Sequence, residues 1–468
     1  MKSRLHASVL AVAVGAGWAL PGAAQAQATA EMSVQDEIAQ MRAEMARMAA
    51  RIDTLEAELD VAEAKAEAAS TTAASTTAAS AAETAGAAAK KAEADDGTKI
   101  SWKGGPLIEG KGGWSFKPRG RIQVDGGFTS VPDSTGRSEG FGNEIRRARL
   151  GVEGDIPGGF GYKFELDFAG NATEVTDAIL TYEDDRLKVA VGQHNNFQGL
   201  EELTSSRFSS FIERAAFTDA FGFERRLGVS ASYGTGDVLV QTGLFSDNIG
   251  DLSNKNWGAD GRVLFTPKMG DTQLHLGGSV HYTDLESGMT VRYRQRPLVH
   301  FTSERFVNTG NLNAESEFGL GLEGAVIAGP FHAAAEGFWQ QVNRPGALTD
   351  PTFFGGYAEA GFFLTGGDSR GYKGAIFDRV KPKNPVDKGG LGAVQVNLRY
   401  DYLDLNDAGI TGGQQNGYYL SLVWTPTAYT RFMANYGMLE YDDAVYALAT
   451  GSRSYSVDSF GVRAQVDF

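Results

Sequence analysis

Beyond the first hundred residues, apolar and polar side chains alternate with a period of two. In the last segment, every second residue from Phe460 to Phe468 is apolar, and Arg463, Gln465 and Asp467 stand between them. Segments of about ten residues, with aromatic residues near the ends of the apolar face, are typical of transmembrane β-strands that separate lipid from water. A soluble sandwich would also alternate, but with shorter strands and its polar face outward. The pattern predicts an all-β transmembrane protein.

Sixteen such segments are predicted, an even number, as in closed single-chain barrels. Closure leaves no strand edge with unpaired backbone groups in hydrocarbon. The strands are expected near 118–129, 143–155, 159–169, 174–183, 186–194, 225–234, 236–246, 257–267, 272–283, 316–328, 331–342, 354–366, 391–404, 415–425, 429–440 and 454–467. The terminal Phe468 is similar to an outer-membrane assembly signal. We therefore expect a 16-stranded antiparallel outer-membrane β-barrel.

The connections between these segments mostly alternate between tight and long. The tight ones, such as Pro157-Gly158 and Gly329-Pro330, are expected in the periplasm. Two connections break the alternation: 194–224 is about thirty residues long, and 367–390 is long although parity places it on the periplasmic side. Long structureless connections in a compact fold usually have a function. Both are candidates for the constriction of a pore.

The N-terminal part follows other patterns. Residues 1–26 have the order of a signal peptide: basic residues, an apolar run, and small residues before a cut after Ala26. In 27–66, apolar residues recur with spacings of three and four, which predicts an α-helical coiled coil that oligomerises. Residues 67–98 are rich in Ala, Ser and Thr and read as a linker, so the barrel is assigned to 99–468.

Composition excludes several classes. The chain has 468 residues, no Cys and a formal net charge of −15. Without Cys there is no disulfide framework, no thiolate metal site and no cysteine nucleophile, and the acidic balance argues against nucleic acid as a partner. The sequence contains no HExxH or GxSxG motif. We expect no metal, no cofactor and no enzymatic activity.

Several arginines are candidates for binding anions. Arg292, Arg294 and Arg296 alternate with other residues, so an extended segment would place three guanidinium groups on one side. Further arginines are expected on lumen faces of strands, namely Arg119, Arg121, Arg147, Arg149 and Arg226. Guanidinium groups stay charged and present forked donors that match the oxygens of phosphate. A row of them would attract anions along a pore, unless neighbouring carboxylates pair with them and they only stiffen the barrel.

Four dispersed segments resemble the phosphate-selective porins O and P. They are FQGLEELTS (197–205) with FIER (211–214), RQRP (294–297) with RFVNTG (305–310), FDRVKPK (377–383) with GLGA (390–393), and YDYLDLN (400–406). The resemblance implies a homotrimer of sixteen-stranded barrels with an arginine ladder and a constriction lysine cluster. Lys373, Lys381 and Lys383 lie where such lysines are expected. Arg207 stands where a lysine is expected in the first long connection, and it binds as a fork rather than as a point charge.

The functional hypothesis is an outer-membrane diffusion porin that selects anions, with phosphate or polyphosphate as the preferred solute. Expected partners are outer-membrane lipid, further copies of the chain, small anions and peptidoglycan. Because the barrel region is itself acidic, a general or weakly cation-selective porin is the alternative. A tether that reaches the cell wall through the coiled coil is the third hypothesis.

Overall fold

The computed structural model describes residues 98–137, 140–170, 172–251 and 255–468. The described residues belong to one compact unit, Asp96–Phe468. The predicted signal peptide and coiled coil, and all but the last residue of the predicted linker, lie outside the described residues.

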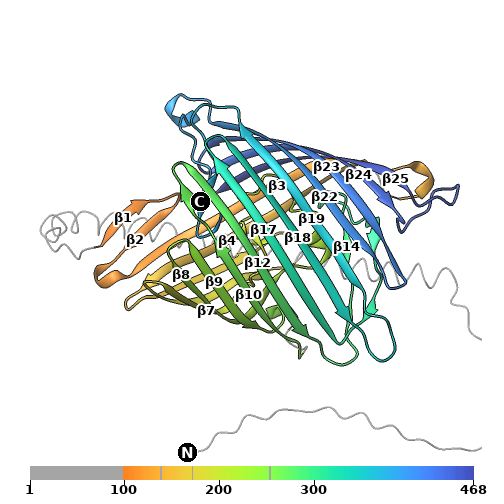
Figure 1. Cartoon of the computed structure of the whole chain (residues 1–468). Helices are drawn as coiled ribbons and strands as arrows, with labels where there is room; N and C mark the ends of the chain where they lie inside the picture. Colours follow the sequence, from red (N-terminus) through yellow and green to blue (C-terminus); the bar gives the residue numbers. More distant parts are fainter. Residues whose placement is uncertain (1–97, 138–139, 171, 252–254) are drawn as a thin grey trace, which may run out of the picture. The chain divides into compact units, whose positions relative to one another are not determined.

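Sixteen antiparallel strands close into a barrel, as the alternating pattern predicts (Figure 1). They are β3 (Ser115–Ser130), β4 (Gly140–Ile156), β5 (Phe160–Asp167), β6 (Glu174–Asp184), β7 (Leu187–Asn195), β8 (Arg225–Thr235), β9 (Val238–Phe245), β10 (Trp257–Phe265), β12 (Thr272–Asp284), β17 (Ser316–Ala328), β18 (Phe331–Asn343), β19 (Thr352–Phe363), β22 (Ala393–Asp407), β23 (Ile410–Thr427), β24 (Thr430–Asp442) and β25 (Tyr455–Asp467). The last strand pairs with the first, from Asp467 opposite Arg121 to Asp458 opposite Ser130.

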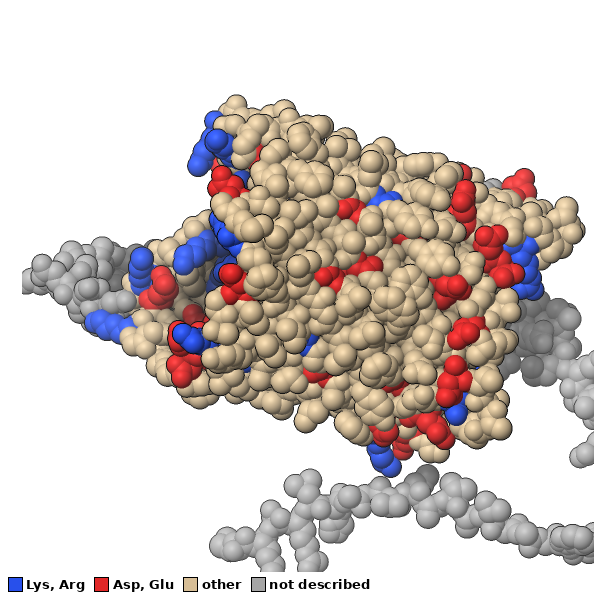
Figure 2. Space-filling view, viewed as in Figure 1, with Lys and Arg blue, Asp and Glu red and all other residues tan. Residues whose placement is uncertain are grey.

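The barrel has an apolar outside and a polar inside. Side chains at alternate positions, such as Ile122 on β3 and Leu420 on β23, are exposed, whereas Gln123 and Ser421 beside them are buried. In Figure 2 charged side chains gather mainly at the two ends of the outer surface. No helix of the described residues is long and apolar enough to cross a membrane.

The two ends of the barrel differ. At one end, here called the turn end, tight turns join most strands, for example between β4 and β5 and between β17 and β18. At the other end, the loop end, most connections are longer, and the joint between β22 and β23 is a short exception. Short 3-10 turns occur in both sets of connections: η2 (Asp133–Thr135), η3 (Ile249–Asp251) and η4 (Val386–Lys388). The two-residue strand β11 (Lys268–Met269) extends the edge of β12.

Three long connections fold into the barrel and fill much of it. The first, 196–224, carries α2 (Leu200–Leu203) and α3 (Ala216–Ala220). The second, 285–315, contains the short strands β13 (Thr290–Val291), β14 (Arg294–Gln295), β15 (Val307–Asn308) and β16 (Leu312–Asn313). The third, 364–392, contains β20 (Gly371–Lys373) and β21 (Ile376–Asp378). Their apolar side chains form one buried cluster with the inner wall, including Phe211, Phe306 and Phe338.

The chain enters and leaves the barrel at the turn end. Before the first barrel strand, β1 (Lys99–Trp102) and β2 (Pro106–Glu109) form a hairpin, followed by η1 (Lys111–Gly113). The C-terminal residue pairs with β3, because the backbone amides of Gly120 and Phe468 each donate to the other's carbonyl at 3.1 and 3.0 Å. A Cβ at Gly120 would lie 2.4 Å from the Phe468 ring.

Gly120→Ala is therefore expected to displace the C-terminal ring and to lower the free energy of unfolding by about 1–3 kcal/mol, as overpacking does. The heat-modifiable mobility of the barrel on a gel measures the folded fraction. Gly126→Ala, on the same face of β3, is the matched control, since its Cβ would meet nothing closer than 3.8 Å. Equal folded fractions in the two variants would contradict the prediction.

Candidate functional site

A cavity of about 1310 Å³ lies inside the barrel between the wall of β3 to β7 and the inward connection 196–224. Residues of the other two inward connections complete its lining, among them Arg296 and Lys373. Both connections that the sequence singles out for their length therefore line one cavity. The third inward connection, 285–315, also contributes residues to the lining of this cavity.

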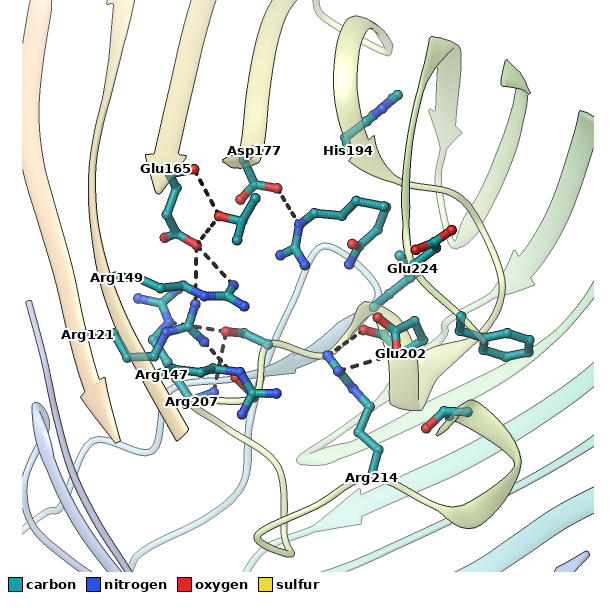
Figure 3. Close-up of a pocket in the computed structure, with 18 of the residues that line it drawn as sticks. Arg121, Arg147, Arg149, Glu165, Asp177, His194, Glu202, Arg207, Arg214 and Glu224 are labelled. Atoms are coloured by element: carbon teal, nitrogen blue, oxygen red, sulfur yellow. Dashed lines mark hydrogen bonds and ion pairs between the residues drawn. The ribbon is translucent and has the colours of Figure 1, made fainter. Parts of the chain in front are cut away.

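Five arginines of two neighbouring strands form one side of the cavity, Arg119 and Arg121 from β3 and Arg146, Arg147 and Arg149 from β4. Figure 3 shows Arg121, Arg147 and Arg149 close together on this side. We call these five residues the arginine wall. All five side chains point inward from the paired strands β3 and β4. Directly opposite side chains of such a pair lie about 5 Å apart, so the five guanidinium groups lie close together.

A β-bulge aims two consecutive arginines of this wall inward. Arg147 stands opposite Gln123 and Ile145 opposite Val124, so Arg146 between them has no partner on β3. The extra residue shifts the alternation, and both Arg146 and Arg147 line the cavity. A second bulge on β6 leaves Thr176 unpaired and directs it to the same cavity as Asp177.

Carboxylates neutralise most of the arginine wall. The Glu165 carboxylate lies 3.3 Å from Arg121 and 3.2 Å from Arg149, and it also pairs with Arg119 at 3.5 Å. Asp167 accepts from Arg149 at 2.6 Å. Among the described residues, eleven Lys or Arg and ten Asp or Glu line the cavity, so its formal charge is close to balanced.

Arg147 differs from its neighbours. Its Nη1 donates to the Gln123 amide oxygen at 3.0 Å, and no described carboxylate lies within ion-pair distance of it. Arg146, one residue earlier, is held by the Glu213 carboxylate at 2.8 and 3.1 Å. Arg147 therefore brings a positive charge to the cavity that no carboxylate neutralises directly.

The opposite side of the cavity belongs to the inward connection 196–224. Arg214 pairs with Glu202 at 3.3 Å and donates to three backbone carbonyls, which fixes the turn around α2. Burial raises the pKa of the Glu202 carboxyl against the pull of Arg214. Burial also raises the pKa of Glu224, and the nearby Asp251 adds to that shift.

The same connection is tied to the barrel by a buried charged network. Arg463 on β25 donates to both oxygens of Asp125 at 2.7 and 2.6 Å, to Glu213 at 2.9 Å, and to the Ile212 carbonyl. Although burial opposes ionisation, Arg146 and Arg463 hold the pKa of the Glu213 carboxyl well below its usual range. The position of the connection 196–224, and hence the width of the cavity beside it, depends on this network.

Comparison with known proteins shows the family to which the chain belongs. A model of the family described as phosphate-selective porin O and P matches residues 116–468, which include every barrel strand except the first residue of β3. The chain belongs to the phosphate-selective porin O and P family. This porin is an outer-membrane channel, and the match starts within the first barrel strand, after the predicted signal peptide, coiled coil and linker.

Individual relatives are similar over most of the chain. An uncharacterised protein of Caulobacter vibrioides is 48% identical over 385 residues, covering 79% of this chain and 77% of its own. Porin O of Pseudomonas aeruginosa is 28% identical, covering 68% and 81%. Among solved structures, the anion-selective porin from Comamonas acidovorans is 14% identical with a TM-score of 0.49, covering 76% of this chain and all of that one.

The structure of the porin brings together only part of the predicted anion pathway. Of the predicted residues, those that line the cavity are Arg119, Arg121, Arg147, Arg149, Arg207, Arg296 and Lys373. Arg207 also pairs with Asp467 at 3.4 Å, and burial together with the nearby Arg119 lowers its pKa. Its guanidinium group thus replaces the expected lysine at the junction of the loop with the last strand.

The other predicted residues lie elsewhere. Arg292 and Arg294 are exposed, and Arg292 donates to Asn308 at 2.9 Å. Arg296 turns to the cavity and pairs with Asp219 at 3.6 Å, so the triplet does not form one unpaired row. Arg226 faces inward but donates to Thr283 at 3.2 Å outside this cavity.

Of the three predicted lysines in the connection 364–392, one lines the cavity and two lie outside its lining. Lys373 precedes the tip of the β20–β21 hairpin, where Gly374 also lines the cavity. Lys381 and Lys383 are exposed and outside the lining; the Lys383 backbone amide donates to Asp368 at 2.7 Å. One lysine of the three therefore reaches the cavity.

Sequence reasoning missed Arg146, Arg214 and Arg225. Arg214 lies within the connection 196–224 and Arg225 is the first residue of β8, so the alternation of a strand does not predict the direction of either side chain. Arg146 does carry a sequence signature. In a regular strand, successive apolar positions on one face are two residues apart, but Ile145 and Ala148 are three residues apart. This extra residue in the alternation indicates the bulge.

The raised pKa values of Glu202 and Glu224 predict a pH dependence of ion selectivity. As the pH falls from neutral, these carboxyls take up protons before ordinary glutamates, while Glu213 stays ionised. The cavity loses negative charge, so the ratio of anion to cation permeability is expected to rise, whichever ion the channel prefers at neutral pH. Zero-current potentials across a KCl gradient at a series of pH values measure it. The double variant Glu202→Gln, Glu224→Gln should flatten the curve, and an unchanged curve would contradict the assignment.

Proposed function

We propose that this porin is anion-selective and that phosphate-class oxyanions pass between the arginine wall and the connection 196–224. Arg147 carries the proposal, because it adds a positive charge to the cavity and no carboxylate in the described part of the chain lies at ion-pair distance from it. In a water-filled constriction, the nearest fixed charges act on an ion most strongly. The forked donors of arginine suit the oxygens of phosphate.

The nearly balanced lining favours a second candidate. With ten acidic side chains among the charged residues of the cavity, most guanidinium groups are held by carboxylates and act as a stiff polar wall. In that case the channel is a general or weakly cation-selective porin with no phosphate site. The two candidates differ in the sign of selectivity and in whether phosphate binds.

The deciding experiment uses the purified porin in a planar bilayer. A zero-current potential of anion-selective sign across a KCl gradient, together with block of the chloride current by millimolar phosphate, supports the proposal. A cation-selective or neutral potential overturns it in favour of the second candidate. Anion selectivity without phosphate block would leave an anion channel and remove the phosphate preference.

We further propose that the porin assembles as a homotrimer with the predicted coiled coil in the periplasm. The heptad pattern of 27–66 and the family membership support this proposal. Cross-linking of the porin in its membrane tests the stoichiometry. Co-sedimentation with peptidoglycan tests the cell-wall tether, and failure to sediment would leave the coiled coil as an oligomeriser only.

A further inference from the structure

The hairpin of β1 and β2 lies outside the barrel wall at the turn end and is held there by its tip (Figure 1). Gly104 has φ +81°, and a Cβ there would lie 2.3 Å from the Tyr429 ring. Gly105 beside it approaches the Pro118 carbonyl oxygen and the Phe468 ring. The tip therefore packs against the joint between β23 and β24 and against the C-terminus, so the hairpin has a fixed orientation on the rim.

One face of the hairpin continues the outer face of the barrel. Ile100 stands opposite Ile108, and Ile108 stands opposite Phe116 at the start of β3. In an antiparallel sheet, residues directly opposite share a face, and Phe116 shares its face with Ile122 further along β3. The apolar outer surface of β3 thus extends onto the hairpin.

Large apolar side chains on the hairpin and the segment after it are strongly exposed. Trp102, on the same face as Ile100, is 72% exposed, and Trp114 before β3 is 53% exposed. On the barrel itself, Trp424 and Phe432 face outward near the same end and stack at 5.5 Å between ring centroids. Tryptophan gathers at the headgroup level of membranes, where one end of the ring is apolar and the other wet.

The charge around the hairpin is opposite to that of the chain as a whole. Between residues 98 and 118 there are four lysines, Lys99, Lys103, Lys111 and Lys117, and one acidic residue, Glu109. Lys117 belongs to β3 and pairs with Glu153 at 3.7 Å, so the hairpin and the segment after it contribute the other three. The whole chain carries −15. Basic side chains are also visible at this end of the molecule in Figure 2. Lysine beside exposed tryptophan is the combination that binds anionic lipid headgroups.

We propose that the β1–β2 hairpin is a lipid anchor that inserts Ile100 and Trp102, with Trp114, among the headgroups and upper acyl chains of anionic phospholipids. The turn end faces the periplasm in a porin of this topology, so the lipid belongs to the periplasmic leaflet. A second copy of the chain is disfavoured as the occupant because it would bring an equally basic segment against this one. The anchor fixes the point at which the N-terminal segment leaves the membrane.

Depth-dependent fluorescence quenching tests the anchor in the full mature porin. Replacing Trp114, Trp257, Trp339 and Trp424 with Phe leaves Trp102 as the reporter, and a variant that keeps only Trp424 is the matched barrel control. Both are reconstituted in vesicles of phosphatidylethanolamine and phosphatidylglycerol brominated either high or low on the acyl chain. We expect quenching of Trp102 by the high bromine and much less by the low one.

Two outcomes overturn the proposal. Quenching of Trp102 by aqueous acrylamide but by neither bromolipid would place the hairpin in water. Protection from all three quenchers would place another copy of the chain over it. The charge contribution is tested by Lys103→Glu with Lys111→Glu, which should lower bromolipid quenching of Trp102 about twofold in phosphatidylglycerol vesicles and leave Trp424 unchanged. Heat-modifiable mobility confirms that each variant is folded.

Discussion

Arg147→Glu is expected to lower the anion permeability of this porin about tenfold at low salt. At ~6 Å from an ion in a water-like medium, one unit charge changes the ion's free energy by about 0.7 kcal/mol, so reversal changes it by about 1.4 kcal/mol. Among the described residues, no carboxylate lies within ion-pair distance of Arg147 to neutralise its charge before the substitution. The anion-to-cation permeability ratio, taken from zero-current potentials in dilute KCl, measures the effect, because salt screens it.

Two further variants make this prediction specific. Arg147→Gln removes one charge and should lower anion permeability about threefold, half the free-energy change of the reversal. Arg294→Glu reverses an exposed arginine that does not line the cavity, so its shift should be much smaller. If Arg294→Glu shifted the ratio as strongly as Arg147→Glu, the pathway would follow the connection 285–315 instead of the arginine wall.

Arg463→Gln is expected to destabilise the barrel by about 3–5 kcal/mol, the usual result of removing one partner from a buried ion pair. The substitution leaves Asp125 without its bidentate donor, removes a donor from the Ile212 carbonyl, and leaves the Glu213 carboxylate paired with Arg146 alone. Because these contacts hold the inward connection 196–224, single-channel conductance should also rise and fluctuate more. The free energy of unfolding in urea and single-channel recordings measure the two effects.

The double variant Asp125→Asn, Arg463→Gln tests the mechanism. It removes both charges of the pair, so its cost should fall below the sum of the single variants, as coupled neighbours require. Arg186→Gln is the surface control, since its ion pair with Asp185 is largely exposed, and a change within about 0.5 kcal/mol is expected. Additive costs in the double variant would show that Arg463 and Asp125 act independently.

The sequence by itself determined the barrel. The sixteen predicted segments correspond to the sixteen strands of the closed sheet. This succeeds because a strand between lipid and water must alternate at every second residue, and the backbone must close to leave no edge in hydrocarbon. The lengths of 194–224 and 367–390 also indicated two of the three connections that enter the lumen, whereas 285–315 was not singled out.

The charges that line the cavity were decided only by the tertiary structure. Alternation shows which residues face inward, but it does not show which carboxylate across the lumen neutralises an arginine: Glu165 meets Arg121 from another strand, and Glu213 meets Arg146 from a loop. The row of Arg292, Arg294 and Arg296 looked unpaired because Asp219 lies far away in the chain.

Strand register and the packing of the inward connections explain the other differences between the predicted and the observed cavity residues. One unpaired residue in the β3–β4 ladder turned Arg146 inward, and the fold of the connection 364–392 brought Lys373 to the cavity while leaving Lys381 outside it. Periodicity is a local property, so the sequence determines which face of a strand is wet. The charge that a passing ion meets depends on side chains tens to hundreds of residues apart in the chain, and the closed barrel alone brings those together.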